Sequence, residues 1–509
     1  MAQQTRHHAL SMAIQAGAQL GLTVALARWF SPDGMGAYGL LGWLIAMAGV
    51  LVHLGGITTT VKYVSEAQGA AAPELAAGYL TRGLRTWGRN LFWVSLLWLA
   101  LGPSMVSTYG QHGLDSALSA ALPLIATSSL FTWLLGACQA LQRYGQCALA
   151  SALWAASLVL ATGLAMAWDG GLVGVLLAQT IAWGMGCAVL WRGLTRWRAG
   201  WWHQPLPGAR QRELRKFAAP LALMVLLDAL IWQRSGVLFL GQSGAPSEVA
   251  YYTLAFGLAQ LAMRTIPGSL IGVLVPAMSR AVGAGDTARV GSLYRVAGRW
   301  MGATAVWLAT LGTVLGPPLL PWIYGEAYGG MVAPFSILLW AGAIAMALGF
   351  PASSVLYALE QQRAVLRMGL ATALLYLLLA IQIIPAHGAQ GAAWVTAIAQ
   401  SLSVAAGVGL AARACGGIRP DWSSLARITR AATVTFVPLW ALASHLPPAL
   451  ALAIGAPLGT VIYALACWKG GVVTSQEQDT LRRWIRHQWT RRHRTPEVTA
   501  ITSPVASIR

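Results

Sequence analysis

Fourteen apolar stretches, each about 17 to 25 residues long, constrain this chain of 509 residues more than any other feature. About 20 apolar residues in an α-helix cross the hydrocarbon core of a bilayer. The helix also satisfies its own backbone hydrogen bonds, which lipid cannot do. The sequence therefore predicts an all-α polytopic membrane protein with about 14 transmembrane helices. The expected helices span 9–29, 37–58, 87–106, 116–140, 148–168, 171–191, 217–240, 250–275, 299–323, 333–357, 367–385, 389–412, 430–446 and 449–468.

The lysines and arginines fix the expected orientation. With the N-terminus in the cytoplasm, 31 of the 34 basic residues lie on the cytoplasmic side, and the exceptions are Arg28, Arg234 and Arg264. Basic connections are retained on the cytoplasmic side during insertion. We therefore expect a multi-pass protein of the bacterial inner (cytoplasmic) membrane with both termini in the cytoplasm. The same bias explains the net charge of +19, which argues against a nucleic-acid partner.

The first apolar stretch has a second interpretation. Arg6, His7 and His8 precede a run that ends in Ala25-Leu26-Ala27, which resembles a signal-peptide cleavage site. The run has full transmembrane length, so we interpret it as an uncleaved first helix.

Short motifs recur along the chain at a nearly constant offset in residue number. Ala37-Tyr38 is echoed by Ala250-Tyr251 at an offset of 213, and Gly171-x-x-Gly174 is echoed by Gly388-x-x-Gly391 at an offset of 217. Ala140-Leu141-Gln142-Arg143 is echoed by Ala358-Leu359-Glu360-Gln361 at an offset of 218. These echoes predict two six-helix pseudo-repeat lobes of the same orientation around a central cavity, plus two C-terminal helices. The expected divisions are an N-lobe at 1–195, a basic cytoplasmic linker at 196–216, a C-lobe at 217–412, two further helices at 425–468 and a basic cytoplasmic tail at 469–509.

The tail contains one amphipathic segment. Trp484 and Trp489 share a helical face, and Arg482, Arg483 and Arg486 flank it. Such a segment favours the surface of an anionic leaflet. A disordered basic tail is the alternative.

No constellation of catalytic residues is present in the sequence. A G-x-x-x-x-G-K-[ST] loop, metalloprotease His/Glu spacing and C-x-x-C pairs are all absent. We therefore expect a protein that is not an enzyme and needs no cofactor or metal.

Polar residues inside the expected helices mark the candidate site. The seventh helix carries Asp228, Gln233 and Arg234, and the eighth carries Arg264. Charge at the bilayer centre costs about 2.5–3.5 kcal/mol on insertion scales, so these residues should face a bundle interior or a wet cavity. Two arginines against one aspartate favour an anionic substrate such as a phosphate.

The first half carries polar residues at matching positions. The offset of 213 places Gln15 opposite Asp228, and His53 lies within two residues of the position opposite Arg264. Gln19 lies one turn from Gln15. We expect all of these side chains to line one cavity, with Asp228 and His53 as candidates for ion coupling.

Each of these residues also has a purely structural interpretation. Arg234 can pair with Asp228, and Arg264 can bond carbonyls that Pro267 leaves free. Gln15 and Gln19 can hydrogen-bond across helices, and His53 can be a satisfied interior histidine.

Several segments resemble the polysaccharide-transporter family, which includes the Wzx-type O-antigen flippases of the multidrug/oligosaccharidyl-lipid/polysaccharide exporter superfamily. The likeness rests on Phe30-Ser31-Pro32-x-Gly34-x-Gly36-Ala37-Tyr38-Gly39-Leu40, Lys216-Phe217-Ala218-Ala219-Pro220-Leu221, Ala250-Tyr251-Tyr252-Thr253-Leu254-Ala255, Ile266-Pro267, Val275-Pro276-Ala277-Met278-Ser279-Arg280 and Gly285-Asp286. It implies a 6 + 6 + 2 helix plan and two lobes that form a V-shaped cavity open to alternate sides.

The resemblance also implies a function. Such a flippase moves an undecaprenyl-pyrophosphate-linked oligosaccharide from the inner to the outer leaflet, with membrane lipids, a polysaccharide polymerase and chain-length machinery as partners. A MATE-like cation-coupled antiporter, a lipid II flippase and a membrane scaffold for polysaccharide enzymes stay open as alternatives.

Overall fold

The computed structural model describes residues 2–108, 114–232, 235–242, 245–265, 267, 271–474 and 477–479. Every regular element in these residues is a helix, which confirms the all-α prediction. Nine helices in this part of the chain are long and apolar enough to cross a membrane. The protein is therefore a multi-pass membrane protein, and the number fourteen stays a prediction.

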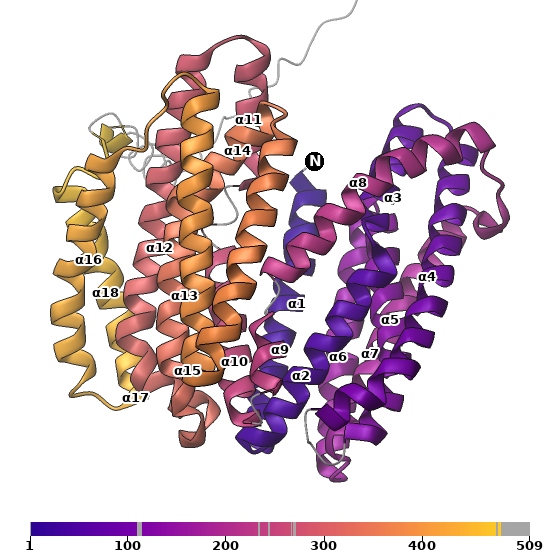
Figure 1. The fold of residues 1–509 in the computed structure, drawn as a ribbon, viewed down its shortest axis with the longest axis horizontal. Coiled ribbons are helices and arrows are strands. Elements are labelled where there is room, and N and C mark those ends of the chain that lie inside the picture. The colour runs from indigo at the N-terminus through magenta and orange to yellow at the C-terminus, as the bar shows by residue number, and fades with distance from the viewer. Residues whose placement is uncertain are drawn as a thin grey trace, which may run out of the picture.

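Seven helices form the N bundle, drawn from indigo to violet in Figure 1. It contains α1 (Ala2–Trp29), α2 (Pro32–His53), α3 (Gly56–Gly69), α4 (Pro73–Thr108), α5 (Leu114–Ala140), α6 (Tyr144–Ala167) and α7 (Gly171–Trp197). Its core is rich in aromatic side chains, and Trp133, Trp154 and Phe131 are fully or almost fully buried.

The C bundle follows the same plan. It contains α10 (Pro246–Thr265), α11 (Ile271–Gly283), α12 (Thr287–Tyr324), η3 (Glu326–Met331), α13 (Val332–Ile344), the π-helical turn η4 (Ala345–Gly349), α14 (Phe350–Ala358) and α15 (Gln362–Ala414). Gly388, with φ 53° and ψ −138°, breaks α15 into two antiparallel arms. The last helices, α16 (Trp422–Ala443), α17 (Pro448–Leu450), η5 (Ala451–Gly455) and α18 (Ala456–Lys469), pack on α12.

Two helices connect the bundles. After the turn η1 (Trp201–His203), α8 (Gly208–Trp232) crosses from one bundle to the other, and α9 (Gly236–Gln242) packs on α15 and α10. The basic connection is anchored: Trp201 is fully buried, and the Thr81 hydroxyl donates to its carbonyl over 2.6 Å. Pro207 is the last residue of this connection, and α8 begins directly after it at Gly208.

The duplication is visible in the backbone. Left-handed residues occur at Ala71 and at Gly285, an offset of 214, and Gln142 and Glu360 share φ 56° at an offset of 218. Gly171 and Gly388, at an offset of 217, also have positive φ. The same turns therefore join equivalent helices, which confirms the pseudo-repeat.

Some expected helix limits are wrong. The span 37–58 is interrupted, because Leu54 (φ 39°) and Gly55 (φ 75°) separate α2 from α3. In the second half, α10 likewise ends at Thr265, although the span 250–275 was expected to be continuous. The span 217–240 is also divided, between α8 and α9.

The third expected helix begins too late. α4 starts at Pro73 instead of residue 87 and has 36 residues, a length of about 54 Å. The hydropathy pattern marks only the part of a helix that lies in lipid. Arginine has a high helix propensity, so the helix continues outside the apolar stretch.

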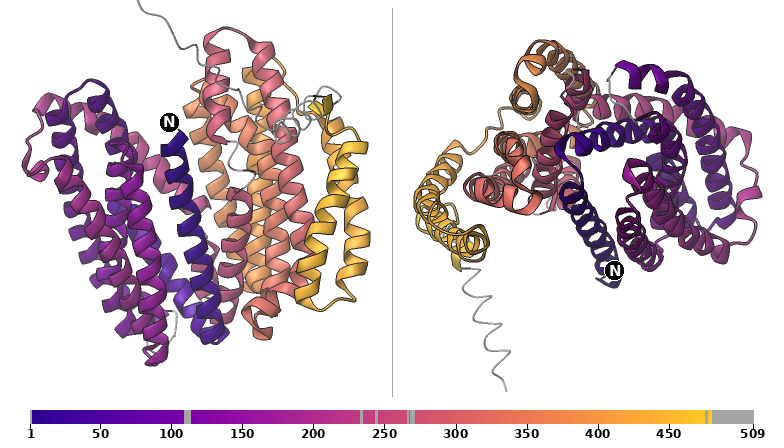
Figure 2. Two further views of the ribbon diagram at one scale, coloured as in Figure 1. Left: turned by 180° about the vertical axis from the view of Figure 1, so that it is seen from behind. Right: turned by 90° about the horizontal axis from the view of Figure 1, so that it is seen from below.

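The bundles form a V. They meet near one end and lie apart at the other, where the N-terminus is placed (Figures 1 and 2). We call the open end the basic end, because the connections there, at 70–72, 141–143, 198–207, 284–286, 359–361 and 415–421, and the helix ends beside them carry most of the lysines and arginines. The connections at the opposite end include 30–31, 168–170 and 444–447.

Candidate functional site

Contacts between the bundles concentrate at the opposite end of the V, which we call the seam. Nε of Arg28 on α1 donates to the carbonyl of Ile323 over 2.7 Å, and the same guanidinium bonds the carbonyl of Trp322. The Tyr328 hydroxyl donates to the Phe30 carbonyl over 3.0 Å. Since Trp322 and Ile323 lie in the last turn of α12, Arg28 caps a helix C-terminus across the seam.

Arg264 lies in the last turn of α10, whose 20 residues extend for about 30 Å. Its side chain is exposed, and it forms no ion pair with any described residue. Residue 266, on which the expected proline kink depends, lies outside the described residues. The guanidinium of Arg264 is thus exposed and has no carboxylate partner among the described residues.

His53 occupies the matching place in the N bundle. It is the last residue of α2, directly before the break at Leu54 and Gly55, and it is partly buried. The break is bridged by the side-chain amide of Asn90 on α4, which donates to the Val52 carbonyl over 3.0 Å. His53 and Arg264 thus lie in the last turns of α2 and α10. These two helices are equivalent, and both end before the limits expected from the sequence.

The two glutamines of α1 differ in their surroundings. The side-chain nitrogen of Gln15 donates to the Ser151 hydroxyl on α6 over 2.8 Å and to Ser11 over 3.2 Å. Ser11 and Ser151 also bond each other over 2.7 Å. Gln15 therefore serves the contact between α1 and α6, whereas Gln19, one turn further, is exposed.

The remaining expected site residues cannot be placed. Gln233 and Arg234 lie outside the described residues, as do Trp484, Trp489, Arg482, Arg483 and Arg486 of the tail. Asp228 lies in the last turns of α8, but its side chain is not described.

An arginine cluster that the sequence reasoning missed lies near the basic end of the N bundle. Arg82, Arg85 and Arg89 follow one another on α4 at helical spacing, and Arg215 approaches them from α8. Burial, and then the charges of Arg215, Arg89 and Arg85, lower the pKa of the Arg82 guanidinium. None of the four pairs with a carboxylate of the described residues.

Phe217, two residues after Arg215 on α8, packs on α3. The Lys62 ammonium lies 4.2 Å from the centre of the Phe217 ring on α8 and 3.7 Å from a Glu66 carboxylate oxygen. Tyr63 packs edge-on against Phe217, with ring centres 5.8 Å apart. These contacts hold α8 on α3, beside the arginines. The spacing of the arginines is visible in the sequence, where the positive-inside bias is enough to account for them.

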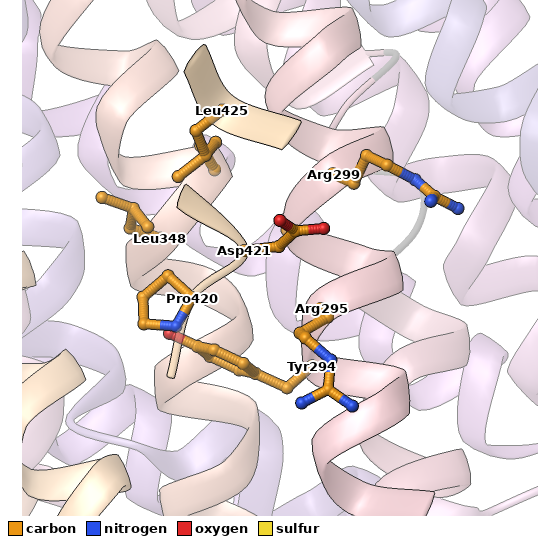
Figure 3. A pocket seen from close by; sticks show the side chains of 9 residues that line it. Tyr294, Arg295, Arg299, Leu348, Pro420, Asp421 and Leu425 are labelled. Atoms are coloured by element: carbon orange, nitrogen blue, oxygen red, sulfur yellow. The ribbon is translucent and has the colours of Figure 1, made fainter. Parts of the chain in front are cut away.

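A small pocket in the C bundle is structural. Tyr294, Arg299, Leu348 and Asp421 line it (Figure 3). It encloses about 10 Å³, which is the room of a single water molecule. Arg299 pairs with Glu477, so this region fastens the chain after α18 to α12.

Comparisons with solved structures identify the fold. A multidrug resistance MATE family transporter of the MOP superfamily, in an inward-facing conformation, aligns with a TM-score of 0.67 at 14% identity over 80% of this chain and 98% of its own. The lipid II flippase MurJ, in an inward closed conformation, aligns with a TM-score of 0.71 at 11% identity over 92% and 98%. A MOP superfamily transporter from Pyrococcus furiosus aligns with a TM-score of 0.55 at 15% identity over 80% and 94%.

Sequence comparisons identify the family. No curated protein sequence matches the chain. The family model described as polysaccharide biosynthesis protein matches residues 25–333, a region that runs from the end of α1 to the start of α13. With the fold of a MOP superfamily transporter, the chain belongs to the polysaccharide biosynthesis protein family.

Proposed function

We propose that this protein is a flippase that moves an undecaprenyl-pyrophosphate-linked oligosaccharide from the cytoplasmic to the periplasmic leaflet of the bacterial inner membrane. The product would supply O-antigen, capsule or exopolysaccharide synthesis. The basic end of the V would face the cytoplasm, together with both termini. The protein would catalyse no bond change.

One observation carries this proposal: arginines that have no carboxylate partner in the described part of the chain lie both near the basic end of the N bundle and in the last turn of α10. Arg82, Arg85, Arg89 and Arg215 form the first group, and Arg264 stands alone. Guanidinium groups bind phosphate oxygens in a planar, two-pronged geometry. We infer that the cluster receives the pyrophosphate and that Arg264 binds it on the way across.

The acidic residues fit the same substrate. Apart from Asp228, whose side chain is not described, the carboxylates nearest the bundle interface have structural partners. Asp33 accepts from the Ser247 backbone N–H over 3.1 Å, and Glu248 accepts from the Ala389 backbone N–H over 2.6 Å. This leaves a surplus of positive charge, which suits an anion.

The physical task explains the need for such a path. Each sugar hydroxyl that enters hydrocarbon without a partner costs about 4–8 kcal/mol. A space between two bundles lets the headgroup cross while its lipid tail stays in the bilayer. An anion that leaves a negative cytoplasm gains about 2.3 kcal/mol per charge per 100 mV, which provides a driving force.

A MATE-like antiporter is the second candidate, because a MATE transporter shares the fold. Cation coupling would then depend on Asp228 or His53. Asp228→Asn and His53→Gln would abolish transport in that case, whereas an anion flippase driven by membrane potential would keep most of its activity.

The test is complementation of a strain that lacks this protein, at equal membrane abundance. We expect Arg264→Gln, Arg234→Gln and the triple change of Arg82, Arg85 and Arg89 to Gln to lose surface polysaccharide, with lipid-linked oligosaccharide accumulating on the cytoplasmic face. Arg280→Gln, at the exposed basic end of α11, is the matched control. Full restoration by all three variants would overturn the site assignment. Normal polymer in the strain without the protein would overturn the function.

A further inference from the structure

The two arms of α15 enclose a groove that contains none of the arginines assigned to the flipped substrate. Its volume is about 610 Å³, within the range of about 300–1,000 Å³ for small-molecule sites. The first arm lines it from Ala364 to Leu375 and the second from Leu402 to Arg413. α15 is long and apolar enough to cross a membrane, and lining residues such as Leu402 are exposed, so we place the groove on the surface that meets lipid.

The interior of the groove is mostly apolar, with Thr372 and Ser403 as its hydroxyl side chains. Small residues on both arms, such as Ala371 and Ala406, leave the space, and Met368, Leu375 and Leu402 form its walls. The stretch from Arg367 to Leu375 is about 12 Å long. A flexible hydrocarbon chain fits these dimensions and this chemistry.

Two arginines line the groove at its basic end. Arg367 and Arg413 are exposed, and neither pairs with a carboxylate of the described residues. Nε of Arg367 donates to the Arg363 carbonyl over 3.3 Å, which leaves its terminal N–H groups free for an anion. The apolar walls suit one acyl chain of a lipid, and the two guanidiniums at the basic end suit its phosphate.

The equivalent surface of the N bundle is covered by protein. Ser151 on α6, which Gln15 of α1 bonds, corresponds to position 369 at the offset of 218. In the C bundle the equivalent helix is divided. Its first part, α8, packs on both bundles: it contacts α15, and it also contacts α2 and α3 of the N bundle, where Leu221 lies 3.0 Å from the Cβ position of Gly55. Among the described residues, only the two arms of α15 line the groove, which therefore has room for another occupant in hydrocarbon.

We propose that this groove binds an anionic glycerophospholipid of the surrounding membrane, with one acyl chain between the arms of α15 and the phosphate between Arg367 and Arg413. The bound lipid would take the place that α1 has in the N bundle. This site is separate from the arginines assigned to the flipped substrate.

Photolabelling of the full chain in vesicles tests the proposal. The probe is phosphatidylglycerol with a diazirine on one acyl chain, and the labelled residues are mapped by mass spectrometry. We expect label to concentrate on Met368, Leu402 and Leu410. Ala406→Trp, which fills the groove, should reduce that label about five-fold or more. The double change of Arg367 and Arg413 to Gln should reduce it about three-fold or more.

The controls separate the proposal from non-specific contact and from misfolding. Val434 and Val437, exposed on α16, should keep their label in every variant, and Arg280→Gln should label like the wild type. Equal labelling of the groove by a phosphatidylethanolamine probe, no effect of the arginine changes, or no effect of Ala406→Trp would each overturn the proposal. In a chain without its native cysteines, complete disulfide formation between Leu223→Cys and Ala406→Cys would show that α8 is the occupant and would also overturn it.

Discussion

Gly36 on α2 lies directly against Pro246 at the start of α10: a Cβ at Gly36 would come within 1.8 Å of the Pro246 carbonyl oxygen. Next to it, the Ser247 backbone N–H donates to Oδ1 of Asp33 over 3.1 Å. Only glycine allows this approach. The contact between the bundles at the seam therefore requires a residue without a side chain at position 36.

Gly36→Ala should therefore hold the seam open. The added methyl meets backbone, which cannot move aside like a side chain. A cysteine placed at Ser247 should react about three-fold or more faster with a membrane-impermeant thiol reagent added from outside, because the population shifts away from the closed seam. Gly17→Ala is the control, since nothing lies within 4 Å of its Cβ position. Unchanged reactivity in Gly36→Ala would contradict this account.

Arg28→Gln should weaken the same seam from α1. The change removes the bonds to the carbonyls of Trp322 and Ile323 and the favourable charge at the C-terminus of α12. An exposed charge near a helix terminus contributes about 0.3–1 kcal/mol, so we expect a small loss of thermal stability together with faster labelling at Ser247→Cys. Arg28→Lys should restore part of both. If snorkelling to lipid were the only role of Arg28, Arg28→Gln would leave the labelling rate unchanged.

Gln15 and Ser151 should behave as a coupled pair. In a double-mutant cycle of Gln15→Ala and Ser151→Ala, measured by unfolding in detergent, we expect a coupling energy of about 0.6 kcal/mol, typical of hydrogen bonds between membrane helices. Complementation should survive Gln15→Ala at equal abundance. Loss of transport with normal stability would instead return Gln15 to the list of path residues.

The sequence predicted the helical class and the duplication well, because hydropathy and short echoes report them directly. The echo of Gln142 by Glu360 marks two turns of identical φ. The breaks were harder to predict, since Leu54 and Gly55 interrupt an apolar run without changing its hydropathy. α4 was shortened for a different reason: Arg82 and Arg85 keep the apolar stretch from beginning before residue 87, but the helix begins at Pro73.

The candidate site was predicted less completely than the fold. Arg264 and His53 stand out as candidates because charge inside an apolar helix is conspicuous, and their role in the site stays a prediction. The cluster of Arg82, Arg85 and Arg215 does not stand out, because it depends on α8 crossing to the N bundle, and no local pattern encodes that contact. Gln15 shows the reverse case, in which a polar residue at the expected depth serves packing.

Asp421 provides a prediction about pH. It begins α16 and accepts the Ser424 backbone N–H over 3.0 Å and the Ser424 hydroxyl over 2.6 Å. The hydrogen bond from the Ser424 side chain is the main cause that lowers the pKa of the Asp421 carboxyl to about 2. Because the folded pKa lies below the unfolded value of about 3.9, this carboxylate stabilises the fold above about pH 4, and the contribution is lost as the pH falls through about 2.

Two substitutions separate the charge from the cap. At pH 5, Asp421→Ala should cost about 1 kcal/mol, the usual contribution of an N-cap, whereas Asp421→Asn should cost less, because its amide oxygen still accepts the Ser424 N–H. Asp421→Asn does not titrate, so the difference in unfolding midpoint between it and the wild type should shrink as the pH falls from 4 to 2. The pKa of Glu477 is also lowered, and it titrates in both proteins, so only this difference isolates Asp421. A difference that stays constant between pH 5 and pH 2 would show that the cap does not depend on the charge.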